Sequence, residues 1–308
     1  MLRKKYLASG LKLALMAVLA GSLFLMGGCG TEGGNEVTSE EASGADTSSL
    51  AINVISREDG SGTRSAFVEL FGVQGEAPDG KKYDDTTIDA VITNSTSVML
   101  TTVEGDVAAI GYVSLGSMNN SVMALEIEGA AATPENVKSG TYPIQRDFNI
   151  ATMGNASAAA EDFINFIMSK EGQAIVEDNN YIAAASNAAD FSSNNASGKV
   201  VVGGSSSVSP VMEKLIEAYV ELNSSVEIQL QTSDSSVGMS STIDGIIDIG
   251  MASRELKDSE LEKGLTPQRI AIDGLAVIVN NDNPVSGMSI DQVRDIFLGN
   301  TKNWSEIA

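Results

Sequence analysis

The sequence of 308 residues has no histidine, one cysteine and one tryptophan. Without histidine it cannot form a Ser-His-Asp or Cys-His nucleophile pair, or a histidine-ligated metal site. A single cysteine excludes an internal disulfide and a thiolate zinc cluster. These absences argue against the common catalytic and metal-dependent functions. We therefore expect no catalytic residue, no metal and no cofactor.

Basic residues are also few. Lys and Arg number 19 against 41 Asp and Glu, a formal net charge of -22. Binding to DNA or RNA through a basic surface requires lysine and arginine to neutralise phosphates, so we expect no nucleic-acid partner. One small anion held in a cleft is a different case, because local N–H and hydroxyl donors and one or two arginines can dominate there.

Residues 1–28 have the features of a targeting segment. Four basic residues precede and enter an apolar run from Leu13 to Met26, and Gly27, Gly28 and Cys29 follow. This arrangement is typical of a secretory signal, and the run is too short for a good transmembrane helix. Cys29 stands where a bacterial lipobox places it, so the segment resembles a lipoprotein signal peptide. The alternative is an ordinary secretory signal with an incidental cysteine.

Cleavage before Cys29 would change the net charge to -26, because the segment carries four basic and no acidic residues. Two acyl chains on Cys29 would hold the mature protein at the outer face of the cytoplasmic membrane. Residues 29–49 are small, polar and acidic, without apolar periodicity. We expect them to form a flexible tether between the lipid and the domain.

From residue 50 onward, short β-like runs alternate with helix-like stretches, which favours an α/β fold. The helical pattern is clearest in 210–222, where Val211, Leu215 and Tyr219 recur at every fourth residue. The Ser/Asn/Gly-rich stretch 186–198 predicts a linker between two blocks. Strands are expected at 51–56, 107–113, 122–127, 149–152, 199–202, 226–231, 246–251 and 274–280, and helices at 63–72, 95–103, 158–169, 172–179, 210–222, 235–244 and 290–298.

Three serine- and glycine-rich turns each follow a β-like run and lead into a helix. They are 57–64 (REDGSGTR), 203–210 (GGSSSVSP) and 232–238 (TSDSSVG). A helix N-terminus offers unpaired N–H groups and a positive dipole end, hydroxyls donate to an oxyanion, and glycine lets the backbone come close. A single turn of this kind is more often only a helix cap. Arg57 can add a bidentate contact, and Asp59 can hold that guanidinium or accept a proton from a protonated anion.

These turns, together with SDSSVGMSSTIDGIIDIGMASREL, resemble the phosphate-binding lipoproteins of bacterial ABC phosphate transporters. Together the similar stretches cover nearly all of residues 51–190 and 198–308. The resemblance implies a two-lobed type II periplasmic-binding-protein fold of the α/β class, with two crossing strands and the ligand buried in the cleft. Supporting stretches are IAIDGLAVIVNNDNPV, DQVRDIFLGNTKNWSEI, AAIGYVSLG, TPENVKSGTYPIQRDF and FINFIMSKEGQAIV.

The two halves stand in the opposite order from the family. The stretch similar to 198–308 comes first in the family, so the chain is predicted to be circularly permuted, with 186–198 joining the usual C-terminus to the usual N-terminus. New ends are tolerated best at a surface connection. The alternative is a fragment of a longer tandem protein. One predicted lobe comprises 51–117 and 276–308 with the first turn, and the other comprises 118–190 and 198–275 with the second and third turns.

The resemblance implies that the anion is bound from both lobes. Some family members have an acidic residue at the position of Arg254, which would accept a hydrogen bond from protonated phosphate and reject sulfate. Here that role stays open between Asp59, Asp234 and a direct contact by Arg254. The implied ligands are Arg57, Ser61, Gly62 and Thr63 in one lobe and Ser206, Ser207 and Ser235 in the other, with Asp59, Ser205, Ser253 and Arg254 as further candidates.

The function implied by the resemblance is that of an extracytoplasmic solute-binding protein and not of an enzyme. It would capture inorganic phosphate and hand it to the permease subunits of an ABC importer, as a monomer attached to the membrane through lipidated Cys29. Three alternatives stay open. One is a binding protein for sulfate, molybdate or another tetrahedral oxyanion. Another is a surface phosphoester hydrolase, and the last is a sensor or scaffold without small-anion affinity.

Overall fold

A computed structural model describes residues 50–154 and 156–307 of the chain. Its largest sheet is mixed and has ten strands. The predicted signal peptide, Cys29 and the tether lie outside the described residues. Along the main path the strand order is β11-β10-β12-β8-β13-β5-β1-β4, and β6 and β9 also pair with β13. The strands are β1 (Asn53–Arg57), β2 (Gln74–Glu76), β3 (Lys82–Asp84), β4 (Val91–Thr93), β5 (Ala109–Ser114), β6 (Val122–Ala124), β7 (Glu126–Ile127), β8 (Gln145–Met153), β9 (Ile182–Ala183), β10 (Gly198–Ser205), β11 (Val226–Ser233), β12 (Ile249–Ala252), β13 (Leu265–Asn280) and β14 (Gly287–Met288).

Helices alternate with these strands along the chain, which confirms the predicted α/β class. Every predicted helix and strand overlaps an observed element. Within the described residues, no helix is both long enough and apolar enough to cross a membrane. The helices are α1 (Gly62–Phe71), α2 (Thr96–Glu104), α3 (Pro134–Ser139), α4 (Ala158–Met168), α5 (Lys170–Asp178), α6 (Ser209–Leu222), α7 (Ser235–Ile243), α8 (Asp258–Leu261) and α9 (Ile290–Phe297).

Apolar side chains gather into two large cores, which divide the described chain into a first and a second lobe. In the first core Phe67 of α1 stacks on Tyr112 of β5, with ring centroids 4.0 Å apart. In the second core Phe163 of α4 packs against Tyr219 of α6, with ring centroids 5.1 Å apart. Each core combines helix and strand side chains, so each lobe has its own source of hydrophobic stabilisation.

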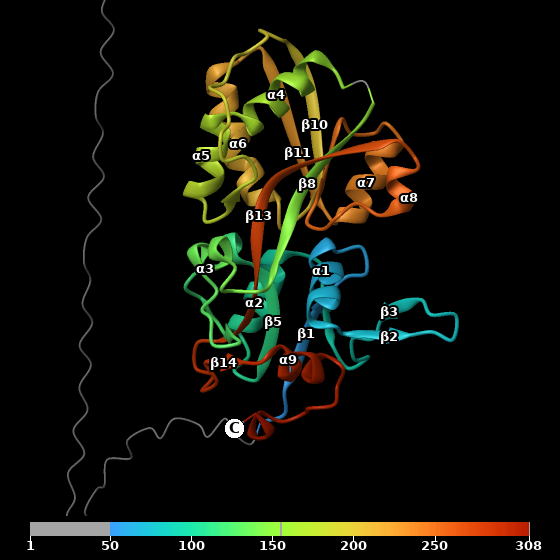
Figure 1. The fold of residues 1–308 in the computed structure, drawn as a ribbon, viewed down its shortest axis with the longest axis vertical. Helices are drawn as coiled ribbons and strands as arrows, with labels where there is room; N and C mark the ends of the chain where they lie inside the picture. Colours follow the sequence, from blue (N-terminus) through green and yellow to red (C-terminus); the bar gives the residue numbers. More distant parts are fainter. Residues whose placement is uncertain (1–49, 155, 308) are drawn as a thin grey trace, which may run out of the picture. The chain divides into compact units, whose positions relative to one another are not determined.

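Two strands, β8 and β13, connect the lobes, as the fold prediction required (Figure 1). They pair antiparallel over most of their length, and beyond Gly274 β13 continues into the first lobe and pairs with β5. The sequence predicted only 274–280 of β13, because the preceding stretch LTPQRIAID is polar and contains a proline. That stretch is nevertheless a strand, because β8 supplies its hydrogen-bond partners.

The division between the lobes differs from the predicted one at residue 118. Residues 122–124 form β6, which pairs with the end of β13 in the first lobe. Leu125 and Tyr142 are also buried in the first core. The chain crosses from the first lobe to the second along β8, which begins at Gln145. The segment before Gln145 therefore stays in the first lobe, where β6 pairs with β13.

The beginning and the end of the described chain lie side by side in the first lobe. The backbone N–H of Trp304 donates to the carbonyl of Leu50 over 3.1 Å, and that of Ile52 donates to Lys302 over 2.8 Å. The buried indole of Trp304 donates to the carbonyl of Ala108 over 3.0 Å. Adjacent ends are what a circular permutation needs, since they can be joined without rearranging the core. The permuted order itself stays a prediction.

The predicted linker 186–198 contains no helix or strand before β10, and the carboxylates of Asp162 and Glu171 accept hydrogen bonds from it. Asp162 of α4 is fully buried and accepts hydrogen bonds from the Ser193 hydroxyl (2.8 Å) and the Asn194 backbone N–H (2.6 Å). It also accepts one from the Tyr219 hydroxyl over 2.8 Å. Burial alone raises the pKa of Asp162, but the hydrogen bonds outweigh it and lower the pKa below its ordinary value.

Replacing Asp162 with Ala should destabilise the fold by about 2–4 kcal/mol at neutral pH, because it leaves buried donors without an acceptor. A depressed carboxyl pKa contributes stability above the ordinary pKa and loses it as the pH falls through the folded value, so the difference should shrink toward pH ~3. Urea unfolding measured over a pH series tests this. The exposed carboxylate of Asp178 on α5 is the control, and an equal loss in Asp178→Ala would contradict the assignment.

Candidate anion site between the lobes

Each of the three predicted turns joins a strand to a helix N-terminus. The first connects β1 to α1, where the Ser61 hydroxyl accepts the Arg64 backbone N–H over 3.3 Å and caps the helix. The second connects β10 to α6, and the third connects β11 to α7. At the third turn the Asp234 carboxylate caps α7 by accepting the Val237 N–H over 2.8 Å. The turns therefore have the local geometry that the sequence predicted.

Side chains from the first and second turns meet between the lobes. The Thr63 hydroxyl lies 2.7 Å from the hydroxyl of Ser207, and 3.4 Å from that of Ser253. The Arg57 guanidinium donates to the Ser206 hydroxyl over 3.1 Å through Nη2. All five side chains are buried. Residues that are far apart in the sequence thus form one polar cluster at the lobe interface.

The second lobe contributes a chain of hydroxyls to this cluster. Ser205 donates to Ser253 over 3.0 Å, and the backbone N–H of Ser253 donates to the Ser235 hydroxyl over 3.2 Å. Ser235 and Ser253 have no exposed surface. The structure therefore brings Ser205 and Ser253, which were the weaker candidates, into the same cluster as Ser206, Ser207 and Ser235.

The charge of Arg57 is balanced by Glu58 and not by Asp59. Arg57 is 2% exposed, and its Nε and Nη2 each donate to one Glu58 oxygen over 2.8 Å. Asp59 is 99% exposed and pairs with Arg64 over 2.9 Å. Of the two roles considered for Asp59, the structure contradicts the contact with the Arg57 guanidinium, because the Asp59 side chain points to solvent while Glu58 reaches both guanidinium nitrogens.

A fourth helix N-terminus joins the cluster and was missed in the sequence. Ser95 caps α2, and the Thr96 hydroxyl lies 3.3 Å from the Ser206 hydroxyl and 3.2 Å from that of Ser207. The backbone N–H of Thr96 points at Ser206 over 3.4 Å. The sequence feature that could have revealed this N-terminus is the polar run Asn94-Ser-Thr-Ser before a predicted helix. This run lacks the glycines that marked the other turns.

Arg254 lies beside the cluster and has another partner. Its Nη1 and Nη2 donate to the two oxygens of Glu260 over 2.9 and 2.8 Å. Burial alone raises the pKa of Glu260, but the hydrogen bonds from Arg254 outweigh it and lower the pKa. Nη2 of Arg254 also lies 3.4 Å from the Ser236 hydroxyl, next to the third turn. Arg254 therefore reaches the edge of the cluster while its charge is balanced by Glu260.

Two glycines allow the lobes to touch. A Cβ atom at Gly62 would lie 2.3 Å from the Ser235 hydroxyl oxygen and 2.8 Å from that of Ser253. A Cβ atom at Gly60 would lie 2.4 Å from Asp234 Oδ1, and the Gly60 carbonyl accepts the Ser236 N–H across the interface. Real Cβ atoms do not approach so closely, so glycine is required here for close backbone contact.

Chemically, the cluster brings together hydroxyl donors, helix N-termini and one guanidinium, all buried from solvent. Donors of this type suit a tetrahedral oxyanion. They do not include an imidazole, since the chain has no histidine.

Comparisons with known proteins place the chain in a family. A family model described as the PBP superfamily domain matches residues 21–171 and 189–308. The phosphate-binding protein PstS 2 of Streptococcus agalactiae is 54% identical over 258 residues, covering 83% of this chain and 88% of that protein. The phosphate-binding protein PstS 2 of Streptococcus pneumoniae serotype 4 is 44% identical over 296 residues, covering 96% and 98%.

A solved structure has the same fold. The crystal structure of the phosphate-binding protein of a phosphate ABC transporter from Streptococcus pneumoniae TIGR4 superposes with a TM-score of 0.67 and 47% identity, covering 84% of this chain and 100% of that chain. Because the alignment with the pneumococcal PstS 2 runs through nearly the whole of both chains, the order of the two halves is shared with that relative.

Replacing Gly62 with Ala should hold the lobes apart, because the new methyl group would overlap Ser235 and Ser253 at a cost of about 1–3 kcal/mol to closure. Small-angle scattering in saturating phosphate should then give a larger radius of gyration than for the unchanged protein. Gly105→Ala is the matched control, since its Cβ would meet no atom nearer than 3.4 Å. If Gly62→Ala closes as fully as the control, the close approach is not required.

Proposed function

Because the chain belongs to the PBP superfamily, in the family of the phosphate-binding proteins named PstS, we propose that it captures inorganic phosphate for an ABC importer. The observation that carries the proposal is the buried cluster of Arg57, Thr63 and serine hydroxyls contributed by both lobes. Such a cluster binds one small anion without an extended basic surface, so it is compatible with the net charge of -22.

The ligand contacts proposed for the anion come from all three turns. Arg57 supplies the charge, and Ser61, Gly62 and Thr63 supply donors at the start of α1. Support comes from their burial and from the contact between the Thr63 and Ser207 hydroxyls across the lobes. The proposed donors of the second lobe are Ser206, Ser207 and Ser235, with Ser205 and Ser253 supporting them, and Thr96 is added from α2.

Capture would proceed by closure of the two lobes around the anion. The connection through β8 and β13 is a pair of strands, which is an arrangement suited to hinge motion. An anion that contacts both lobes interacts more strongly with the closed state and so shifts the population toward it. The closed form would then present the surface that the permease subunits recognise.

We propose that hydroxyl groups, and not a carboxylate, accept the hydrogen bond from a protonated phosphate oxygen. Of the carboxylates near the turns, Asp59 pairs with Arg64, Asp234 caps α7 and Glu58 pairs with Arg57. The Thr63 and Ser253 hydroxyls can accept a hydrogen bond from a protonated oxygen, but they can also donate to sulfate. Discrimination should therefore be weaker than a dedicated carboxylate acceptor would give.

The cellular setting is proposed from the sequence and the relatives together. The protein would work outside the cytoplasm as a monomer, attached to the outer face of the cytoplasmic membrane through lipidated Cys29. Its partners would be inorganic phosphate and the permease subunits of the importer. Support comes from the signal-like residues 1–28 and from the phosphate-binding names of its relatives.

We also propose that the protein binds phosphate without catalysing a reaction. A surface phosphoester hydrolase built on the same turns would turn over a phosphomonoester, whereas the proposed protein would leave it intact. A sensor or scaffold would have no affinity for small anions. The absence of histidine favours binding over hydrolysis, since the usual general base is missing.

Titration calorimetry with phosphate, arsenate, sulfate and molybdate tests the function. Phosphate should bind at one site, and Arg57→Ala should weaken it by about 2–4 kcal/mol, or ~30- to 1,000-fold, because the charge is lost and Glu58 is left unpaired. Arg294→Ala is the control, since that arginine is partly exposed on α9 and pairs with Asp291. Failure of every anion to bind would sink the proposal, and an unchanged affinity in Arg57→Ala would place the site elsewhere.

Competition between sulfate and phosphate at neutral pH tests the proposed role of the hydroxyls. A site that lacks a dedicated acceptor for the phosphate proton should favour phosphate by less than ~10³-fold, because a large rejection ratio of about 10⁴ or more requires a polar group left unpaired by the wrong ligand. A measured preference above ~10⁴ would show that a carboxylate takes this role after all.

A further inference from the structure

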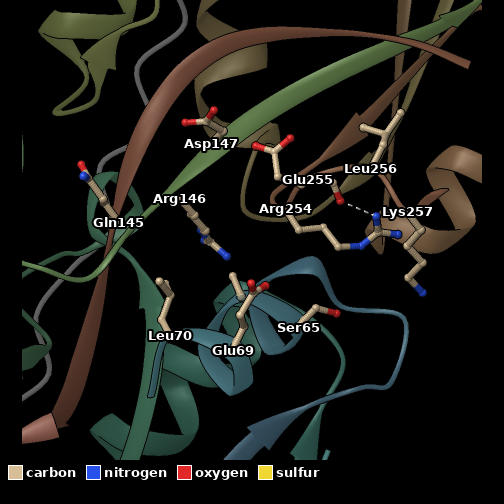
Figure 2. Close-up of a pocket in the computed structure, with 11 residues that line it drawn as sticks. Ser65, Glu69, Leu70, Gln145, Arg146, Asp147, Arg254, Glu255, Leu256 and Lys257 are labelled. Carbon is tan, nitrogen blue, oxygen red and sulfur yellow. Dashed lines mark hydrogen bonds between the residues drawn. The ribbon is translucent and has the colours of Figure 1, made fainter. Parts of the chain in front are cut away.

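An ion pair stands at the point where the two connecting strands pass from one lobe to the other. Arg146 of β8 (Figure 2) and Asp273 of β13 face each other directly in the antiparallel ladder. On one side of Arg146 along the chain, Ile144 belongs to the first core, and on the other side Phe148 belongs to the second. The pair therefore lies at the boundary between the lobes, in the strands about which they would rotate.

The pair is buried and is tied to both lobes. Asp273 has no exposed surface, and its Oδ2 accepts hydrogen bonds from Nε and Nη2 of Arg146 over 3.1 and 3.0 Å. Its Oδ1 accepts one from the Ser114 hydroxyl of β5, in the first lobe, over 2.8 Å. The guanidinium carbon of Arg146 lies 5.2 Å from the centroid of the Phe148 ring in the second core. One carboxylate and one guanidinium thus connect a first-lobe strand to the packing of the second lobe.

Side chains around the pair leave little room for a change of hinge angle. The Tyr181 ring of the second core lies against Gly116, just after β5 in the first lobe, and a Cβ atom at Gly116 would overlap that ring. Burial, and next the charge of Asp273, raise the pKa of Tyr181 above its ordinary value. Tyr181 also packs against Phe148, with ring centroids 5.4 Å apart. Rotation of one lobe against the other must therefore disturb packed rings close to the ion pair.

Asp273 is charged at neutral pH although it is buried. Burial raises the pKa of Asp273 to about 6, and the charge of Arg146 and the hydrogen bond from Ser114 oppose this rise. Because both side chains of the pair are almost fully buried, only the paired geometry satisfies both charges. A hinge angle that separates them is consequently unfavourable.

We propose that Arg146 and Asp273 are positioning residues for anion capture, which hold the hinge at the angle that brings the two lobes together at the serine cluster. Neither belongs to the proposed anion contacts, so they act through the connecting strands. Without the pair, the closed form would populate a wider range of hinge angles, and the anion would lose its contacts with one lobe more often. Release would then be faster, whereas association, which begins from the open form, would be unchanged. The kinetic part of this inference rests on the proposed function, and the hinge part does not.

Distances between the lobes, measured by pulsed electron paramagnetic resonance, test the hinge directly. Spin labels are attached through Glu104→Cys on α2 and Glu221→Cys on α6, both exposed positions, in the full chain carrying Cys29→Ser. Arg146→Met combined with Asp273→Leu removes both charges and leaves neither one buried and unpaired, so this double variant should fold. In saturating phosphate at pH ~8, its distance distribution should be broader than that of the chain with the ion pair. The single variant Asp273→Asn should broaden it too, and distributions as narrow as with the ion pair would overturn the proposal.

Stopped-flow kinetics with phosphate test the effect on capture. In the double variant the release rate should rise about tenfold or more, while the association rate changes less than ~threefold. Asp147→Asn is the matched control, because Asp147 follows Arg146 on β8, points to the opposite side of the strand (Figure 2) and pairs with the exposed Arg269. This control should leave both rates unchanged.

Two results decide between the inference and the proposed function. If the double variant releases phosphate as slowly as the control, the positioning role is wrong. If the unchanged protein binds no phosphate, the proposed function fails, and the distance distributions still decide whether the ion pair holds the hinge.

Discussion

The lobe interface depends on how the buried charge of Arg57 is accommodated. Arg57 is almost fully buried, is paired with Glu58 on its own lobe and donates to Ser206 on the other. A buried charge is unfavourable unless it is paired and hydrogen-bonded, so the interface must supply polar groups around it. The serine- and threonine-rich helix N-termini do this, and Gly60 and Gly62 let the backbones come close enough.

This constraint explains how an acidic protein can hold an anion. The net charge of -22 is spread over the whole chain, whereas the donors lie in one shielded cluster where the dielectric is low. Long-range repulsion is screened by salt within about 10 Å, and the local contacts are not. The missing histidines agree with the same account, since a binding cluster needs donors and not a general base.

Much of this organisation could be predicted from the sequence, and the limits have physical causes. The turn at 57–64 was recognisable because strand, glycine and helix signals coincide there. Thr96 was missed because its polar run, Asn94-Ser-Thr-Ser, lacks the glycines that marked the other turns, and the sequence does not show that it meets Ser206. Asp59 was one candidate partner for Arg57 and Glu58 was not considered, since the sequence does not show which neighbouring carboxylate points inward. The first half of β13 was missed because Pro267, Gln268 and Arg269 interrupt its apolar pattern, and pairing with β8 nevertheless makes the whole stretch a strand.

A crystal structure of the chain with bound phosphate would test the central claim most directly. The account predicts one phosphate between the lobes, with its oxygens within hydrogen-bond distance of the Arg57 guanidinium, the Thr63 hydroxyl and at least one of Ser206, Ser207 and Ser235. Phosphate bound elsewhere, or contacted by one lobe alone, would contradict it.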